Sequence, residues 1–265
     1  MSAVTLSFGL VGADLHRPSP DADAVPSDFA SVVSPKGDRF RDGFTRACLY
    51  LAGRNMPDPP AADTTVVVGT EYGNLDAMLR LQRLAVAGER RISAQQFPHA
   101  TTSSAAVFLN LEQGVRGGNM TLNAGPRTPV VALLQGLLHV NAYPQAASHV
   151  LIGDVYCPEA RDDVRKKAGP EMAVTSALCW VGLRSGDSHR AVVSFRPGPD
   201  DVDSGRVFAD DAHGPQPVDW NRALVTHRFL AAVGELPVGA AATLRVGAGD
   251  RVARLTIQRT SGGVR

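Results

Sequence analysis

The chain has 265 residues, 44% of them hydrophobic, which allows one large domain or two small ones and excludes a chain that is disordered throughout. Its 27 basic side chains nearly balance 26 acidic ones, and no basic run is longer than Arg165-Lys166-Lys167. This pattern argues against binding of nucleic acid or of an anionic membrane, so we expect partners that are neutral protein surfaces or small molecules.

The three cysteines, Cys48, Cys157 and Cys179, form no CxxC pair, and their odd number is typical of a reducing compartment. Residues 1–12 lack the basic start of a signal peptide, and no apolar run approaches the roughly 20 residues of a membrane-spanning helix. We therefore expect a cytoplasmic protein, and no motif predicts a metal site or a cofactor.

The first part of the chain predicts strands and helices in turn. Residues 5–11 alternate like a strand, the Pro- and Asp-rich residues 17–35 are typical of a loop, and residues 41–51 have helical spacing. Residues 64–69 (TTVVVG) are a β-branched run of the kind buried in parallel sheets. A turn follows them, and then a helix over residues 74–87 that we expect Asn74 to cap.

The alternation continues to about residue 155. Residues 103–112 predict a helix ended by Gly114, residues 119–123 a strand, residues 128–140 a strongly apolar helix, and residues 149–155 a further strand. Strands that alternate with helices in this way are typical of an α/β sheet covered on both faces.

The pattern then changes, because a charged loop is predicted at residues 159–167 and a pair of strands at 172–183 and 190–196, with no helix between them. Residues 197–217 are rich in Pro, Gly and Asp and predict an exposed connection. Beyond them, the sequence predicts a helix over 221–233 and a hairpin of strands at 242–246 and 252–258.

Residues 117–133, GGNMTLNAGPRTPVVAL, resemble the nucleophile region of the β-ketoacyl synthases, which reads roughly GPNxTxDTACSSSLVAL. In that family, backbone N–H groups and the dipole of a buried helix stabilise a cysteine thiolate at the turn after a strand. Residues 66–73, 96–118, 150–155 and 171–183 are similar to other segments of the family, in the same order. The resemblance implies an α/β, thiolase-like layered fold.

The departures from the family pattern concern its catalytic residues. Pro126 stands where the family has its nucleophilic cysteine, and proline offers neither a thiolate nor a backbone N–H. The chain has no GHxxG motif and no lysine after Lys167, so the family's two histidines and lysine are missing too. We expect a protein with no catalytic residues of its own, with a ketosynthase-like N-terminal domain at residues 1–196 and a shortened C-terminal half at 197–265.

As a short chain without the cysteine, this protein resembles the chain-length-factor-like proteins of aryl polyene and related type II polyketide systems. Those proteins pair with an active ketosynthase. The resemblance implies a heterodimer with a β-ketoacyl synthase subunit, indirect contact with an acyl carrier protein, and a strand at 119–123 that runs antiparallel to its counterpart. It places the interface at Phe97, Ala105, Ala106, Thr121 and Asn123, and the residues that gate the acyl tunnel at Asn74, Ala77, Met78 and Leu81.

Two alternatives remain open from the sequence. One is a stand-alone acyltransferase or thioester hydrolase that uses relocated residues such as Cys157 or His99. The other is a homodimeric acyl-binding scaffold without a ketosynthase partner.

Overall fold

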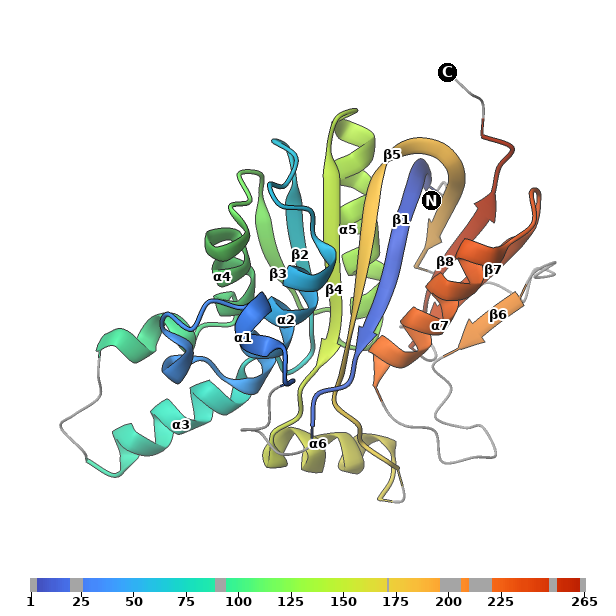
Figure 1. Ribbon diagram of the computed structural model, residues 1–265. Coiled ribbons are helices and arrows are strands. Elements are labelled where there is room, and N and C mark those ends of the chain that lie inside the picture. Colours follow the sequence, from blue (N-terminus) through green and yellow to red (C-terminus); the bar gives the residue numbers. More distant parts are fainter. Residues whose placement is uncertain are drawn as a thin grey trace.

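The computed structural model describes residues 4–19, 26–88, 94–170, 172–195, 206–209, 221–247 and 252–262 (Figure 1). The strands are β1 (Val4–His16), β2 (Thr65–Gly69), β3 (Asn119–Leu122), β4 (Ala147–Asp154), β5 (Ala177–Ser194), β6 (Arg206–Ala209), β7 (Ala241–Val246) and β8 (Ala253–Arg259). The α-helices are α1 (Phe29–Val32), α2 (Gly43–Asn55), α3 (Leu75–Val86), α4 (Ser104–Gln113), α5 (Thr128–Ala142), α6 (Pro158–Ala168) and α7 (Arg222–Glu235). Three short 3-10 helices are η1 (Asp38–Phe40), η2 (Ala94–His99) and η3 (Gly125–Arg127).

The strands of the described residues form one eight-stranded mixed sheet in the order β3-β2-β4-β5-β8-β7-β6, with β1 paired to β5. Strand β2 is parallel to both β3 and β4, whereas β5 is antiparallel to β4, β1 and β8. The 18-residue β5 pairs with β4 through residues 177–184 and with β8 through residues 189–194. It therefore joins the N-terminal strands to the C-terminal hairpin.

Helices cover both faces of the parallel strands, which confirms the prediction from the alternating pattern. On one face α2 and α4 bury Leu49 and Leu109 against Leu151, and on the other α5 and α7 bury Leu133 and Phe229. Helices α5 and α7 each contact β4 and β5 and also β7 and β8. The C-terminal hairpin thus packs on the same two helices as the N-terminal strands.

Helix α6 corrects the prediction of a charged loop at residues 159–167. It begins with Pro158, carries Glu159 in its first turn and has basic residues in its last turn, all of which favour a helix. Its apolar side is short, because among its described side chains only Ala160 and Val164 are buried, against Tyr156 and the first turns of α3. So short an apolar stripe gave no helical signal in the sequence.

Two further expectations about the second half were wrong. The predicted strand pair at 172–183 and 190–196 is one strand, β5, because β1 pairs along both of its halves and residues 185–188 form an irregularity opposite Phe8 and Gly9. The predicted connection at 197–217 contains strand β6, which pairs in parallel with β7, and its other residues lie outside the described ranges.

The other predicted helices and strands are confirmed within a few residues, except that β1 continues beyond the predicted residues 5–11 to His16. The predicted loop at 17–35 was wrong in part, because it contains α1. Helix α4 ends at Gly114, whose φ of 65° suits glycine, and α7 begins after Asn221, whose side chain accepts a hydrogen bond from Ala223 N. Strands β7 and β8 are antiparallel, as a hairpin requires. In the part of the chain that the structure describes, no helix is long and apolar enough to cross a membrane.

Candidate functional site

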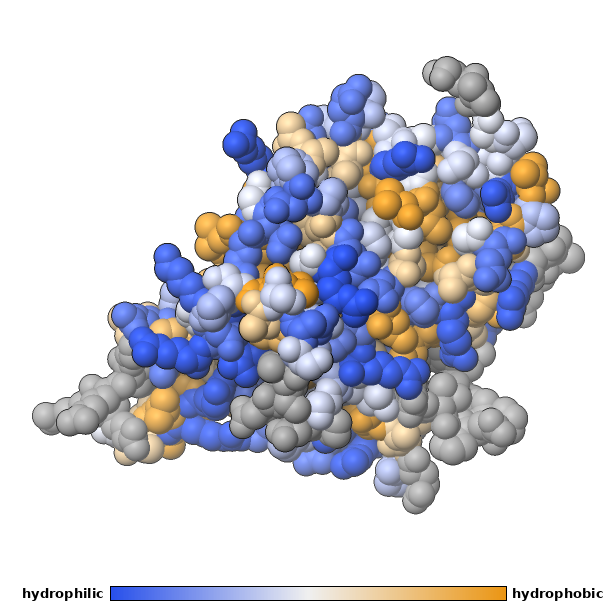
Figure 2. All heavy atoms as spheres, viewed as in Figure 1, coloured by the Kyte–Doolittle hydropathy of each residue, from blue (hydrophilic) through white to orange (hydrophobic). Residues whose placement is uncertain are grey.

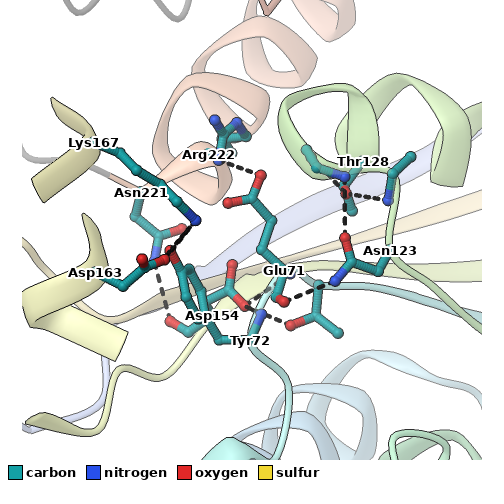
Figure 3. A network of polar contacts seen from close by, with 12 residues as sticks. Glu71, Tyr72, Asn123, Thr128, Asp154, Asp163, Lys167, Asn221 and Arg222 are labelled. Atoms are coloured by element: carbon teal, nitrogen blue, oxygen red, sulfur yellow. Dashed lines mark hydrogen bonds and ion pairs between the residues drawn. The ribbon is translucent and has the colours of Figure 1, made fainter. Parts of the chain in front are cut away.

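The carboxyl ends of the parallel strands β2, β3 and β4 meet at one edge of the sheet, where open α/β sheets bind ligands (Figure 3). Asp154, the last residue of β4, is buried and its Oδ1 accepts hydrogen bonds from Glu71 N (3.0 Å), Tyr72 N (2.8 Å) and the Thr70 hydroxyl. Burial raises the pKa of this carboxyl, although its hydrogen bonds to residues 70–73 oppose the shift. Asp154 thus fixes the turn that follows β2.

The turn between β3 and α5 holds Pro126, the position that the resemblance aligns with the nucleophile of the β-ketoacyl synthases. Asn123 Oδ1 accepts a hydrogen bond from Gly125 N (3.0 Å), and Thr128 Oγ1 accepts from Ala124 N (2.9 Å) and donates to Gly125 O (2.7 Å). Gly125 has a φ of 56°, which lets the chain turn sharply. Pro126 follows it in η3, directly before α5.

A pocket of about 490 Å³ opens beside Pro126, and its described lining comprises Glu71, Tyr72, Asn123, Gly125, Pro126, Val164, Lys167 and Arg222. None of these is a cysteine, serine, threonine or histidine, so the described lining offers neither a usual acyl-accepting nucleophile nor an imidazole base. Tyr72 donates from its hydroxyl to Asp163 Oδ2 (2.7 Å), which also forms an ion pair with Lys167 (2.5 Å).

An ion pair between Glu71 and Arg222 lies in the same pocket, with 2.7 Å between Oε1 and Nη1 and side chains that are only 15% and 10% exposed. Burial raises the pKa of Glu71, and the charge of Arg222 opposes this shift. Asn221 precedes Arg222 and donates from Nδ2 to the main-chain oxygens of Asp154 and Thr175, both at 3.0 Å. The start of α7 is therefore attached to the strand ends.

Sequence analysis did not identify this network. The only signal was positional, because Glu71 and Asp154 stand at the ends of predicted strands and Asn221 and Arg222 at the start of a predicted helix.

The two relocated candidates, Cys157 and His99, lie apart from this pocket and from each other. Cys157 precedes α6 and lines a separate pocket of about 200 Å³, where burial raises the pKa of its thiol. His99 stacks on Phe108 with 4.5 Å between ring centroids, and burial lowers the pKa of its imidazole. The structure does not bring them together as a nucleophile and a base.

The four predicted tunnel residues of α3 have three different environments. Asn74 does not cap the helix as we expected; it is buried, and its Nδ2 donates to His99 O (2.8 Å) and Thr101 O (2.7 Å). Ala77 and Leu81 line a small cavity of about 100 Å³ together with Phe40, whereas Met78 is 37% exposed. Only Ala77 and Leu81 therefore share a cavity, and their role in a tunnel stays a prediction.

The expected interface residues divide into buried and accessible ones. Ala105 and Ala106 are fully buried where α4 packs on the sheet, so they cannot touch a partner directly, and this corrects their placement in the interface. Phe97 is 54% exposed, and Thr121 and Asn123 lie on and just after β3. The exposed apolar residues of this region also include Val107 and Leu111 of α4 and Met120 of β3. Figure 2 shows a small hydrophobic spot at the place of α4, bordered by hydrophilic side chains.

Strand β3 is an edge of the sheet. Gly118 O accepts from Val66 N (3.1 Å) and Leu122 O accepts from Thr70 N (3.0 Å), so the alternate residues Asn119 and Thr121 direct their backbone N–H and C=O away from β2. No strand of the described residues pairs on that side. Strand β1 differs, because the Asn141 amide bonds to both backbone groups of Ser7 (3.1 and 2.8 Å).

No protein-family model and no curated protein matches this chain. Solved structures do match. One match is a chain described as the ishigamide ketosynthase/chain length factor. The match spans 92% of this chain and 89% of that one, with a TM-score of 0.68 and 16% identity. A second match is a chain in the structure of a ketosynthase (ApeO) in complex with its chain length factor (ApeC) from Xenorhabdus doucetiae. It spans 96% of this chain and 100% of that one, with a TM-score of 0.59 and 12% identity.

A β-ketoacyl synthase from Burkholderia phymatum STM815 matches 91% of this chain over 87% of its own length, with a TM-score of 0.65 and 9% identity. These similarities, together with the layered sheet and the turn before α5, show that the chain has the thiolase-like fold of ketosynthases and chain length factors.

Proposed function

We propose that this chain is a non-catalytic, chain-length-factor-like subunit that pairs with an active β-ketoacyl synthase in polyketide or fatty-acid-type biosynthesis and shapes its acyl tunnel. The observation that carries the proposal is Pro126 in η3, the short helix before α5, beside a pocket whose described lining contains no cysteine, serine, threonine or histidine. A chain that has this fold but lacks the nucleophilic cysteine of the β-ketoacyl synthases has no thiolate on which to load an acyl chain by that family's route.

The edge strand β3 supports the pairing. Asn119 and Thr121 direct main-chain groups away from β2, and exposed apolar residues lie on the same strand (Met120) and on the contacting helix α4 (Leu111). A long-lived exposed edge of this kind promotes unspecific association, and a partner strand removes it. One of the matching structures is described as a ketosynthase in complex with its chain length factor. We propose the same kind of assembly here, in an aryl polyene or related type II polyketide system.

Co-expression with a β-ketoacyl synthase encoded beside this chain tests the pairing. We expect the two chains to co-purify as a complex with one copy of each, measured by size-exclusion chromatography with light scattering. Separate elution of the two chains at micromolar concentration would contradict the proposal.

A second test addresses catalysis. The purified chain is incubated with an acyl carrier protein thioester and its intact mass is recorded, with the ketosynthase as the positive control. We expect an unchanged mass, because the described lining of the pocket contains no cysteine, serine, threonine or histidine. A stable acyl adduct on Cys157 or elsewhere would favour the acyltransferase alternative.

The homodimeric scaffold is favoured by one observation, since an antiparallel pair of two β3 edges is self-complementary. The mass of the chain purified alone distinguishes the two cases. A stable homodimer that does not exchange with the ketosynthase would support the scaffold.

A further inference from the structure

A continuous set of polar contacts joins the start of α7 to the end of the edge strand (Figure 3). Arg222 forms its ion pair with the Glu71 carboxylate at 2.7 Å, and the main-chain oxygen of Glu71 accepts a hydrogen bond from Asn123 Nδ2 at 2.8 Å. Asn123 in turn accepts from Gly125 N at 3.0 Å. One ion pair and one hydrogen bond therefore connect Arg222 to Asn123, the residue that follows β3.

Glu71 is held at three of its groups. Its N–H donates to the buried Asp154 carboxylate, its side chain pairs with Arg222, and its carbonyl accepts from Asn123. A carboxylate that is only 15% exposed is costly to leave without its cation, so it would take up a proton or move toward water. A movement of Glu71 would shift the acceptor that holds Asn123.

We infer that Arg222, acting through Glu71, is a positioning residue that sets the geometry of Asn123 and the end of β3 for association with the partner chain. The inference rests on the proposed function, because it assumes that β3 is the edge that the partner pairs with. It makes the C-terminal part of the chain, through the first turn of α7, a determinant of an interface built from the N-terminal part.

The test compares Arg222→Met with the charge reversal Glu71→Arg/Arg222→Glu in the full chain. Glutamate suits the first turn of α7, because a helix N-terminus favours negative charge. The matched control is Arg83→Met, which removes another Arg–Glu ion pair, between α3 and α6, that has no contact with β3. Each variant is compared with the wild type by its dissociation constant for the ketosynthase and by its melting temperature.

A second readout needs no partner. The exchange rate of the Gly125 amide hydrogen reports the bond to Asn123 Oδ1 in the isolated chain. We expect Arg222→Met to speed this exchange and to weaken association about tenfold, the control to change neither, and the charge reversal to restore both.

The outcomes separate the inference from the proposed function. If the wild type does not bind the ketosynthase, the proposed function fails, and Gly125 exchange in Arg222→Met still decides whether Arg222 positions Asn123. If the wild type binds and Arg222→Met leaves exchange and affinity unchanged, the inference is wrong. If the variant unfolds, the charge reversal decides: a folded reversal with wild-type exchange and affinity supports the inference, and a folded reversal with altered ones overturns it.

Discussion

Pro126 changes the turn before α5 in two ways. By the resemblance to the β-ketoacyl synthases it stands in place of the cysteine that carries the acyl group, and as a proline it has no backbone N–H to donate within η3. The pocket beside it is occupied at one wall by the Glu71–Arg222 ion pair. The loss that the resemblance implies thus concerns both the nucleophile and the turn that would hold it.

Replacing the proline tests how complete that loss is. We expect Pro126→Cys to show no condensing activity with acyl carrier protein substrates, because no histidine or second cysteine belongs to the described lining of the pocket. Product formation is measured by mass spectrometry, with an active ketosynthase as the control. Turnover by the variant would mean that a base outside the described lining reaches residue 126.

His149 predicts an acid-dependent loss of stability. It is 3% exposed, neither ring nitrogen has a hydrogen-bond partner among the described residues, and burial lowers its pKa from 6.5 to about 4. Between these values the unfolded chain binds the proton more readily, so stability falls as the pH drops through this range. At full protonation the loss approaches about 3 kcal/mol.

The matched variant is His149→Phe, which keeps a ring to stack on Trp180. Urea unfolding at pH 7.5 and pH 4.5 should show a smaller acid-dependent loss in the variant than in the wild type. Asp42 acts in the opposite direction, because burial raises its pKa to about 6, but it is common to both chains. An equal loss in both would show that His149 is not the group responsible.

At the scale of one strand, a substitution in β3 can disrupt the proposed interface with the ketosynthase without damage to the core. Thr121 directs its N–H away from β2, and proline is tolerated at an edge where the N–H faces outward. We expect Thr121→Pro to leave the far-UV circular dichroism unchanged and to weaken binding to the ketosynthase at least about tenfold, since one main-chain bond and the close approach of the strands are lost.

Leu111→Arg is the side-chain counterpart, because Leu111 is 71% exposed on α4, a helix that contacts β3. Ala106 is unsuitable for this purpose, since an arginine there would disrupt the buried side of α4. Wild-type affinity in both Thr121→Pro and Leu111→Arg would place the interface on another surface.

Helix α3 provides a test of whether this protein controls the length of the acyl product. Ala77 and Leu81 lie four residues apart and line the same small cavity, of about 100 Å³. If an acyl chain extends toward it, Ala77→Trp fills the space and shortens the product, because packed interiors yield little. Leu81→Ala should give products of equal or greater length. The measurement is the product-length distribution of the reconstituted complex.

Complex formation is the control for α3, since a looser heterodimer lowers yield without a change in length. An unchanged distribution in a variant that still binds the ketosynthase would leave α3 a purely structural helix.

For the whole molecule, the sequence predicted most helices and strands, but not which of their side chains face the core and which face solvent. Regular periodicity and end signals located α4, α7 and the β7–β8 hairpin. Helix α6 was missed because its buried stripe is two residues wide, and β5 was divided because residues 185–188 interrupt its alternation. Ala105 and Ala106 were placed in the interface because a helix pattern does not tell whether an alanine faces the core or a partner.

The pairing of β1 with β5 governs the order in which this protein can fold during its synthesis. Val4 pairs with Val193 and Leu15 with Cys179, so the first strand to leave the ribosome has no partner until most of the chain has been made. Contacts between such distant residues are slow to form and leave hydrophobic strands exposed meanwhile. If the proposed pairing with a ketosynthase holds, translation of that subunit close by would shorten the time that the edge strand β3 is exposed without a partner strand.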